Sequence, residues 1–230
     1  MANKFELVKK IEKIAPLETA EIWDNCGWQI EYKEKTEVNK VMLCLTVTQD
    51  ILSQAQEQNC DMIISHHPLF TVPMAFNRGI EIYSAHTNLD KAQNGTTETL
   101  ISKLGFTINE TLEHDFLRFV DVSINAHDLL DRLKNVSKNI RYSGFLDGNL
   151  TRIAFCAGSG SEFWHDAKTM GAEVLVTGDL KFHTALDSEI SIVDIGHFES
   201  EIQVLSTLRL VLGNDVEIII AKEKSPIVQI

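Results

Sequence analysis

The fold is decided by a stretch of sequence that begins with KVMLCL at residues 40–45 and ends with CDMIISHH at residues 60–67. A second stretch repeats this pattern 112 positions later without a gap, from RIAFCA at residues 152–157 to AEVLVTGD at residues 172–179. In both copies a short apolar run precedes a segment of helical character and a second apolar run. The repetition predicts two copies of a strand–helix–strand unit and therefore an internally duplicated protein.

A second pair of matching segments follows the two copies. AHTNLD at residues 85–90 corresponds to GHFESE at residues 196–201 at an offset of 111, and each carries a histidine followed four residues later by a carboxylate. A duplicated unit places equivalent strand ends near each other around a pseudo-two-fold axis. Because imidazole and carboxylate groups are ligands for divalent metals, the pattern indicates a metal site before it indicates any substrate.

Strands and helices alternate along most of the chain, which predicts an α/β fold with mostly parallel or mixed sheets. We expect strands at 41–47, 62–65, 80–85, 153–157, 174–177, 190–195 and 216–221. Apolar spacing predicts helices at 5–14, 126–136 and 200–212, whereas 106–150 is the least regular part of the chain. Since no flexible linker is evident, we expect two interlinked α/β halves, 1–110 and 111–230, that share one metal site.

The composition narrows the class of protein. The 230 residues are 44% hydrophobic and 23% charged, which is typical of a soluble globular protein. The formal net charge of −12 argues against nucleic acid or an anionic membrane as the main partner, although a small phosphorylated ligand remains compatible with a local positive pocket.

Further features of the sequence concern the compartment. No apolar run approaches the ~20 residues of a membrane helix, and the N-terminal residues lack a signal-peptide core. The four cysteines form no CxxC pair, so we expect reduced, buried thiols in a cytoplasmic protein.

Four polar clusters follow directly after expected strands. They are the pair His66 and His67, the pair His86 and Asp90, the dipeptide Gly178-Asp179, and the pair His197 and Glu201. Open α/β sheets bind their ligands at the carboxyl ends of the strands, so four such clusters at that edge favour a binding site. A single histidine in such a place is more often structural, and that is our prediction for His114, His127 and His165.

The geometry expected of the clusters suits a pair of metals. On a helix, His197 and Glu201 would lie one turn apart on the same face, so both can reach one ion or two adjacent ions. His66 and His67 would point to opposite faces within a strand, but a turn at the strand end lets each imidazole serve a different ion.

Three weaker signals remain open. The aromatic turn WDNCGW at residues 23–28 is more typical of a packed turn than of a functional site. The loop GSGS at residues 158–161 is compatible with an anion site and equally with a plain tight turn. Lys181 and His183 can either reach the site from the second copy or lie on a solvated helix.

The chain resembles a known family through five motifs in the same order: EIWDNCG (21–27), ISHHPL (64–69), YSAHTNLD (83–90), TGDLKFH (177–183) and GHFESE (196–201). These motifs are similar to those of the NIF-three-like proteins (Ngg-one-interacting factor three), which are often labelled GTP cyclohydrolase I type 2 homologs. The resemblance implies two divalent metal ions per chain. It also implies a toroidal homohexamer whose metal sites open towards its interior. The ligands that it implies are His66, His67, Asp90, His197 and Glu201.

The leading functional hypothesis is a metal-dependent hydrolase that acts on a nucleotide. In its sharpest form, a metal-activated water attacks C8 of the guanine ring of GTP and formate is released, with His86 or His183 as candidates for proton transfer. The same centre is also compatible with a metal-dependent phosphoesterase. A non-enzymatic metal-binding scaffold or regulatory ring is the alternative from another class. Mixed nitrogen and oxygen ligation suits Zn, Fe, Mn or Mg, so the sequence leaves the metal open.

Overall fold

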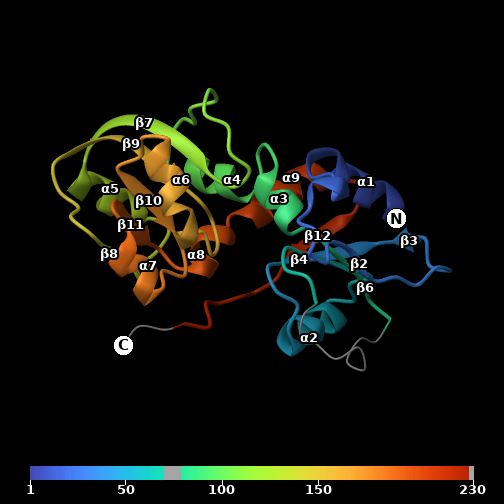
Figure 1. Cartoon of the computed structure of the whole chain (residues 1–230). Helices are drawn as coiled ribbons and strands as arrows, with labels where there is room; N and C mark the ends of the chain where they lie inside the picture. Colours follow the sequence, from blue (N-terminus) through green and yellow to red (C-terminus); the bar gives the residue numbers. More distant parts are fainter. Residues whose placement is uncertain (70–78, 228–230) are drawn as a thin grey trace. The chain divides into compact units, whose positions relative to one another are not determined.

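The computed structural model describes residues 1–69 and 79–227 (Figure 1). The chain divides into two compact units. Unit 1 contains Met1–Gly95 and Val204–Lys224, and unit 2 contains Thr96–Gln203 and the described residues from Ser225 onward.

Unit 1 is built on a five-stranded sheet with the order β12-β4-β5-β6-β2. The strands β12, β4, β5 and β6 run parallel, and β2 is an antiparallel edge strand. Every residue of β5 and β6 is buried, as expected for the centre of a sheet that is covered on both faces. The bounds are β2 Gly27–Ile30, β4 Lys40–Cys44, β5 Met62–Ser65, β6 Glu81–Ser84 and β12 Glu217–Ile220.

Two helices of unit 1, α1 and α2, begin at residues whose side chains cap them. The Asn3 side chain accepts hydrogen bonds from the amides of Phe5 and Glu6 in α1, and the Thr48 hydroxyl accepts one from the amide of Ile51 in α2. The two-residue strands β1 (Ala2–Asn3) and β3 (Glu37–Val38) form a separate small sheet. The helices are α1 Lys4–Ile14, the short 3-10 helix η1 Leu17–Thr19, α2 Gln49–Glu57, α3 Thr87–Lys91 and α9 Val204–Leu212.

Unit 2 contains a second five-stranded sheet with the order β7-β9-β10-β11-β8. The strands β9, β10 and β11 are parallel, and β7 and β8 are antiparallel strands at the two edges. The strands are β7 Arg118–Asn125, β8 Arg141–Ser143, β9 Asn149–Phe155, β10 Val174–Thr177 and β11 Ser191–Asp194. The helices are α4 Thr96–Lys103, α5 Ala126–Leu133, η3 Ser161–Phe163, α6 Trp164–Thr169, α7 Phe182–Asp187 and α8 His197–Glu201.

The register of the strands confirms the internal duplication. Val41 of β4 pairs with Met62 of β5, and Ile153 of β9 pairs with Val174 of β10, so the pairing repeats with the offset read from the sequence. Both pairs are parallel and both are joined through a helix. The copies differ at one edge, where β12 is parallel to β4 but β7 is antiparallel to β9.

The units divide at a different place from the boundary expected near residue 110. The first unit ends at Gly95, and Val204–Lys224 returns to it because β12 pairs with β4 and α9 packs against α1. The helix expected at 200–212 is also interrupted, since a turn separates α8 from α9. The strand itself was expected at 216–221, but its long-range pairing with β4 has no local signature, and this pairing accounts for the difference. Among the described residues no helix is long and apolar enough to cross a membrane.

Candidate metal centre

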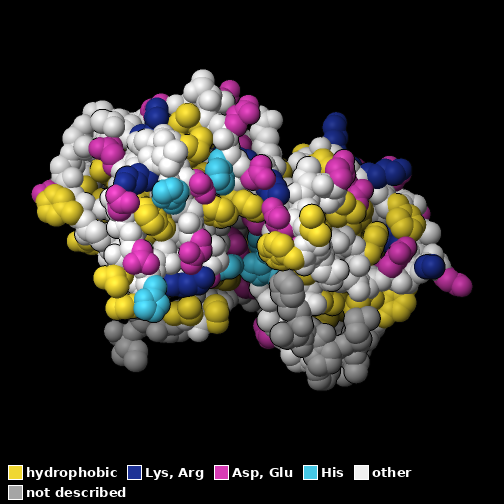
Figure 2. Space-filling view, viewed as in Figure 1, with side chains coloured by type: hydrophobic (Ala, Val, Ile, Leu, Met, Phe, Trp, Pro, Cys, Tyr) yellow, Lys and Arg dark blue, Asp and Glu magenta, His cyan; other side chains and the backbone are white. Residues whose placement is uncertain are grey.

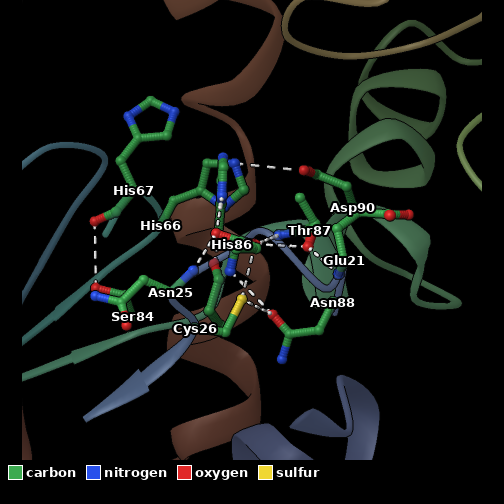
Figure 3. A network of polar contacts seen from close by, with 12 residues as sticks. Glu21, Asn25, Cys26, His66, His67, Ser84, His86, Thr87, Asn88 and Asp90 are labelled. Atoms are coloured by element: carbon green, nitrogen blue, oxygen red, sulfur yellow. Dashed lines mark hydrogen bonds and ion pairs between the residues drawn. The ribbon is translucent and has the colours of Figure 1, made fainter. Parts of the chain in front are cut away.

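Three histidines gather at the carboxyl ends of β5 and β6 in unit 1 (Figure 3). The ring centroids of His66 and His67 are 4.9 Å apart, and that of His86 lies 5.2 Å from the first and 5.5 Å from the second. One ligand nitrogen from each ring lies within 4.8 Å of the others. This arrangement can hold a metal ion, and it contains both histidines of the expected pair together with His86.

His66 is completely buried and its ring orientation is fixed by the backbone. Its Nδ1 lies 2.9 Å from the carbonyl oxygen of Ala85, and because a carbonyl only accepts, Nδ1 carries the hydrogen. Its Nε2 then faces Oδ1 of Asp90 at 3.5 Å, the contact drawn in Figure 3. Asp90 lies on α3, so this short helix brings a predicted carboxylate ligand to a predicted imidazole ligand.

His67 is held by groups from two neighbouring strand ends. Its Nδ1 lies 2.6 Å from the hydroxyl of Thr46, which follows β4. Its carbonyl accepts hydrogen bonds from the hydroxyls of Ser65 at 2.8 Å and Ser84 at 3.2 Å. The carboxylate of Glu223 in turn accepts hydrogen bonds from the backbone amides of Leu45 and Thr46. The turn after β5 is therefore fixed at both its backbone and its imidazole.

A second group of titratable side chains lies in unit 2. His197 and Glu201 belong to α8, and Nε2 of the histidine is 3.0 Å from Oε2 of the glutamate, so the expected spacing of one helical turn is confirmed. Nδ1 of His197 lies 2.7 Å from Oδ2 of Asp179. Burial works to lower the pKa of His197, but hydrogen bonds to Asp179 and Glu201 outweigh it and raise that pKa to about 10. Asp179 thus orients the imidazole, and its own pKa is lowered by this hydrogen bond.

Asp194 supports the loops on both sides of this second group, and the sequence did not indicate it. Its buried Oδ2 accepts a hydrogen bond from the amide of Leu180 at 2.9 Å and from Nε of Arg141 at 2.8 Å, and its Oδ1 accepts one from the amide of Gly196. These bonds link the loop after β10 to the loop that enters α8. The only sequence signal was a carboxylate inside an otherwise apolar strand.

The Gly-Ser loop after β9 packs directly against the Glu201 carboxylate. A Cβ atom at Gly158 would clash with Oε1 of Glu201, and this glycine has a φ of +72°. The amide of Gly158 donates to the Ser200 hydroxyl and that of Gly160 donates to the Thr177 hydroxyl. These two amides bond within unit 2, so they hold the loop as a tight turn against the Glu201 carboxylate.

The remaining sequence candidates lie on the surface or serve the backbone. Lys181 is exposed and forms an ion pair with Glu162 at 3.1 Å, and His183 is exposed with its ring against Phe182. His114 accepts hydrogen bonds from two backbone amides, as a structural histidine does. His127 and His165 are exposed.

The donor set fits divalent metal ions. Nδ1 of each of the four histidines described above meets an oxygen atom of a carbonyl, hydroxyl or carboxylate group. Metal-binding histidines have such oxygen partners, which fix the ring orientation and support its basicity. Imidazole and carboxylate groups without thiolate suit an exchangeable site better than a closed structural zinc cage.

Comparison with known proteins identifies the family. The family model for Duf34/NIF3 (NGG1p interacting factor 3) matches residues 2–226. The chain belongs to the NIF3 family.

Curated relatives of this NIF3 protein agree with that assignment over nearly their whole length. It is 32% identical to the GTP cyclohydrolase 1 type 2 homolog of Clostridium perfringens, with 95% of each chain covered. It is 31% identical to the GTP cyclohydrolase 1 type 2 homolog of Campylobacter jejuni, with 96% of this chain and 97% of the relative covered.

Solved structures show the same fold. Reduced HcgD from Methanocaldococcus jannaschii matches with a TM-score of 0.82 at 25% identity, covering 95% of this chain and 97% of the other. A Bacillus cereus protein related to NIF3 matches with a TM-score of 0.86 at 19% identity, covering 100% and 99% of the two chains. The predicted α/β class and the resemblance stated from the motifs are therefore confirmed.

Proposed function

We propose that this NIF3-family protein is a dinuclear-metal-dependent hydrolase that acts on a nucleotide, with a reaction of the GTP cyclohydrolase I type 2 kind. The observation that carries the proposal is the arrangement of His66 and His197, which follow the ends of strands. In each ring Nδ1 contacts an oxygen atom that fixes the ring, and Nε2 faces a carboxylate. The names of the curated relatives support the choice of nucleotide. The proposed ligands of the two ions are His66, His67, Asp90, His197 and Glu201.

The protein contributes metal ligands whose positions are fixed and whose negative charge balances that of divalent ions. When bound, divalent ions supply a water of lowered pKa, near ~7 in the best cases, and electrostatic stabilisation of developing negative charge. Ala85 and Asp179 fix the rings of His66 and His197 through their Nδ1 atoms, so these ligands need little reorganisation. Carboxylates at Asp90 and Glu201 offset the charge of the ions.

A second candidate, a metal-dependent phosphoesterase, is favoured by the same mixture of imidazole and carboxylate ligands, because two-metal sites with such ligands stabilise the attacking and leaving oxygens of a phosphoryl group.

The third candidate is a ring-shaped scaffold without catalysis. Exposed apolar side chains on unit 2, namely Tyr142, Phe145, Phe182 and Leu186, support self-association into the proposed toroidal homohexamer. Figure 2 shows hydrophobic side chains exposed beside basic and histidine side chains over α7.

The test is an activity screen of metal-loaded protein against GTP, other nucleotides and model phosphoesters, with Mn, Fe or Zn restored after chelation. Formate release from GTP is expected, together with its loss in a Glu201→Ala variant and its retention in His127→Ala, a matched change at an exposed histidine. Free phosphate or nucleoside as product would replace the cyclohydrolase form by the phosphoesterase. No turnover of any substrate by fully loaded protein would favour the scaffold.

A further inference from the structure

The turn at residues 23–28, for which the sequence favoured a packed turn over a functional site, contains a buried carboxylate. The side chain of Asp24 has no exposed surface. Its Oδ2 accepts hydrogen bonds from the Thr87 amide at 3.0 Å, the Thr87 hydroxyl at 2.5 Å and Sγ of Cys26 at 3.0 Å. Its Oδ1 accepts one from the amide of Asn25 and lies 3.0 Å from Nδ1 of His86. A packed turn does not need a buried carboxylate with this many donors.

The groups around Asp24 keep it ionised. The amides of Asn25 and Thr87, which only donate, meet Oδ1 and Oδ2 respectively, so both oxygens of the carboxylate act as acceptors. The Cys26 thiol adds a further donor to Oδ2. An ionised carboxylate only accepts hydrogen bonds, and therefore Nδ1 of His86 carries a hydrogen.

This hydrogen bond determines which nitrogen of His86 can bind a metal. With Nδ1 protonated, the lone pair of the neutral ring is on Nε2. The His86 ring packs against the rings of His66 and His67, with centroids 5.2 Å and 5.5 Å away. His66 has the same arrangement, since its Nδ1 bonds to a carbonyl. Unit 1 thus contains a cluster of three imidazoles, with an oxygen partner at each Nδ1.

We propose that His86 is a metal ligand, forming with His66 and His67 a three-imidazole site for one divalent ion, and that Asp24 is its positioning residue. The proposal rests on the metal centre of the proposed function but adds a ligand that the five-residue set does not contain. Every ligand of this site belongs to unit 1, so the site does not require His197 or Glu201. Three neutral nitrogen donors favour a borderline ion such as Co²⁺ or Zn²⁺ over Mg²⁺.

The test isolates the site in the full-length chain. In a His197→Ala/Glu201→Ala background, equilibrium dialysis with Co²⁺ should show one ion per chain, and X-ray absorption should count three imidazoles around it. Adding His86→Ala should weaken Co²⁺ binding at least ~10-fold and leave two imidazoles. Adding Asp24→Asn should weaken binding ~10–100-fold while three imidazoles remain at saturation. His127→Ala in the same background should change neither quantity.

A measurement on metal-free wild-type protein keeps the proposal testable even if a variant fails to fold. Nitrogen-15 NMR of the histidine side chains should show the hydrogen of His86 on Nδ1, and Asp24→Asn should remove that preference. The proposal is overturned by a background variant that binds no Co²⁺, by unchanged affinity and imidazole count after His86→Ala, or by an Nε2-protonated His86. Absence of hydrolysis by wild-type protein would remove the proposed reaction and would not alter these results.

Discussion

Asp61 of unit 1 and Glu173 of unit 2 bind the backbone of the first strand of their own repeat, β4 and β9 respectively, in the same way. Oδ2 of Asp61 accepts hydrogen bonds from the amides of Asn39 and Lys40 at 2.7 and 3.2 Å. Oε2 of Glu173 accepts them from Thr151 and Arg152 at 2.6 and 3.2 Å. Since each residue in unit 2 follows its counterpart by the same offset, the duplication extends from strand order to individual backbone hydrogen bonds.

These two carboxylates predict a pH-dependent contribution to stability. Burial works to raise both pKa values, but it is outweighed by the backbone hydrogen bonds, together with Lys35 at Asp61 and the Thr151 hydroxyl at Glu173. Both pKa values therefore lie below their ordinary values of 3.8 for Asp61 and 4.5 for Glu173. A lowered folded-state pKa gives stability that is present above the unfolded pKa and is lost as pH falls through the folded pKa. Asp61→Asn should therefore cost roughly 1 kcal/mol at pH 7, and Glu173→Gln less, because Glu173 is exposed.

Urea unfolding of both variants from pH 7 to pH 3 measures this contribution. The difference from wild type should shrink as pH falls below about 4, where wild type also loses the charge. A difference that stays constant with pH would mean that the side chains act through packing alone.

The proposed ligand set predicts the metal content. Protein purified without chelator should contain more than one equivalent of divalent metal by elemental analysis, with loss in His67→Ala and in Glu201→Ala. Binding to the folded state alone raises stability with ion concentration, so loaded protein should melt at a higher temperature than metal-free protein. Full occupancy in Glu201→Ala would contradict the assignment of that residue.

Two glycines of unit 2 allow backbone strain to be separated from an effect on the site. Gly158 and Gly148 have similar φ values of +72° and +75°, but only at Gly158 would a Cβ meet the Glu201 carboxylate. Both alanine variants should lose about 1 kcal/mol of stability from the left-handed backbone. Gly158→Ala alone should also weaken metal binding, measured by dialysis. Equal metal affinity of the two variants would show that Glu201 tolerates the contact.

The buried ion pair of Lys4 and Glu81 predicts a large cost when it is broken. Nζ and Oε1 are 2.8 Å apart and both side chains are fully buried. Lys4→Met should cost about 3–5 kcal/mol by denaturant unfolding, because it leaves a buried carboxylate without its cation. Lys9→Met is the matched control, since its pair with Glu6 is exposed and should contribute less than about 1 kcal/mol. Similar costs for the two variants would mean that Glu81 is compensated by other groups.

The sequence predicted what depends on local pattern. The apolar runs before His66 and before Gly178 located the strand ends, and the four-residue spacing placed His197 and Glu201 on one helix. The sequence did not predict the partners of these residues. Asp24 reaches His86 across 62 positions and Glu223 reaches Thr46 across 177, and no local pattern indicates hydrogen bonds of that separation. The interruption after α8 was missed because Ile202 and Gln203 continue the helical spacing of the residues around them.

The return of β12 to the sheet of unit 1 has a consequence for biosynthesis. On the ribosome, all of Thr96–Gln203 is made before Glu217–Ile220, so unit 2 can fold while β4 is still an open edge. An unpaired apolar edge strand is a template for aggregation until its neighbour arrives. A chain that terminates before β12 should therefore contain a folded unit 2 and a unit 1 whose exposed β4 edge is prone to aggregation. Completion of unit 1 thus depends on one of the last segments to be synthesised.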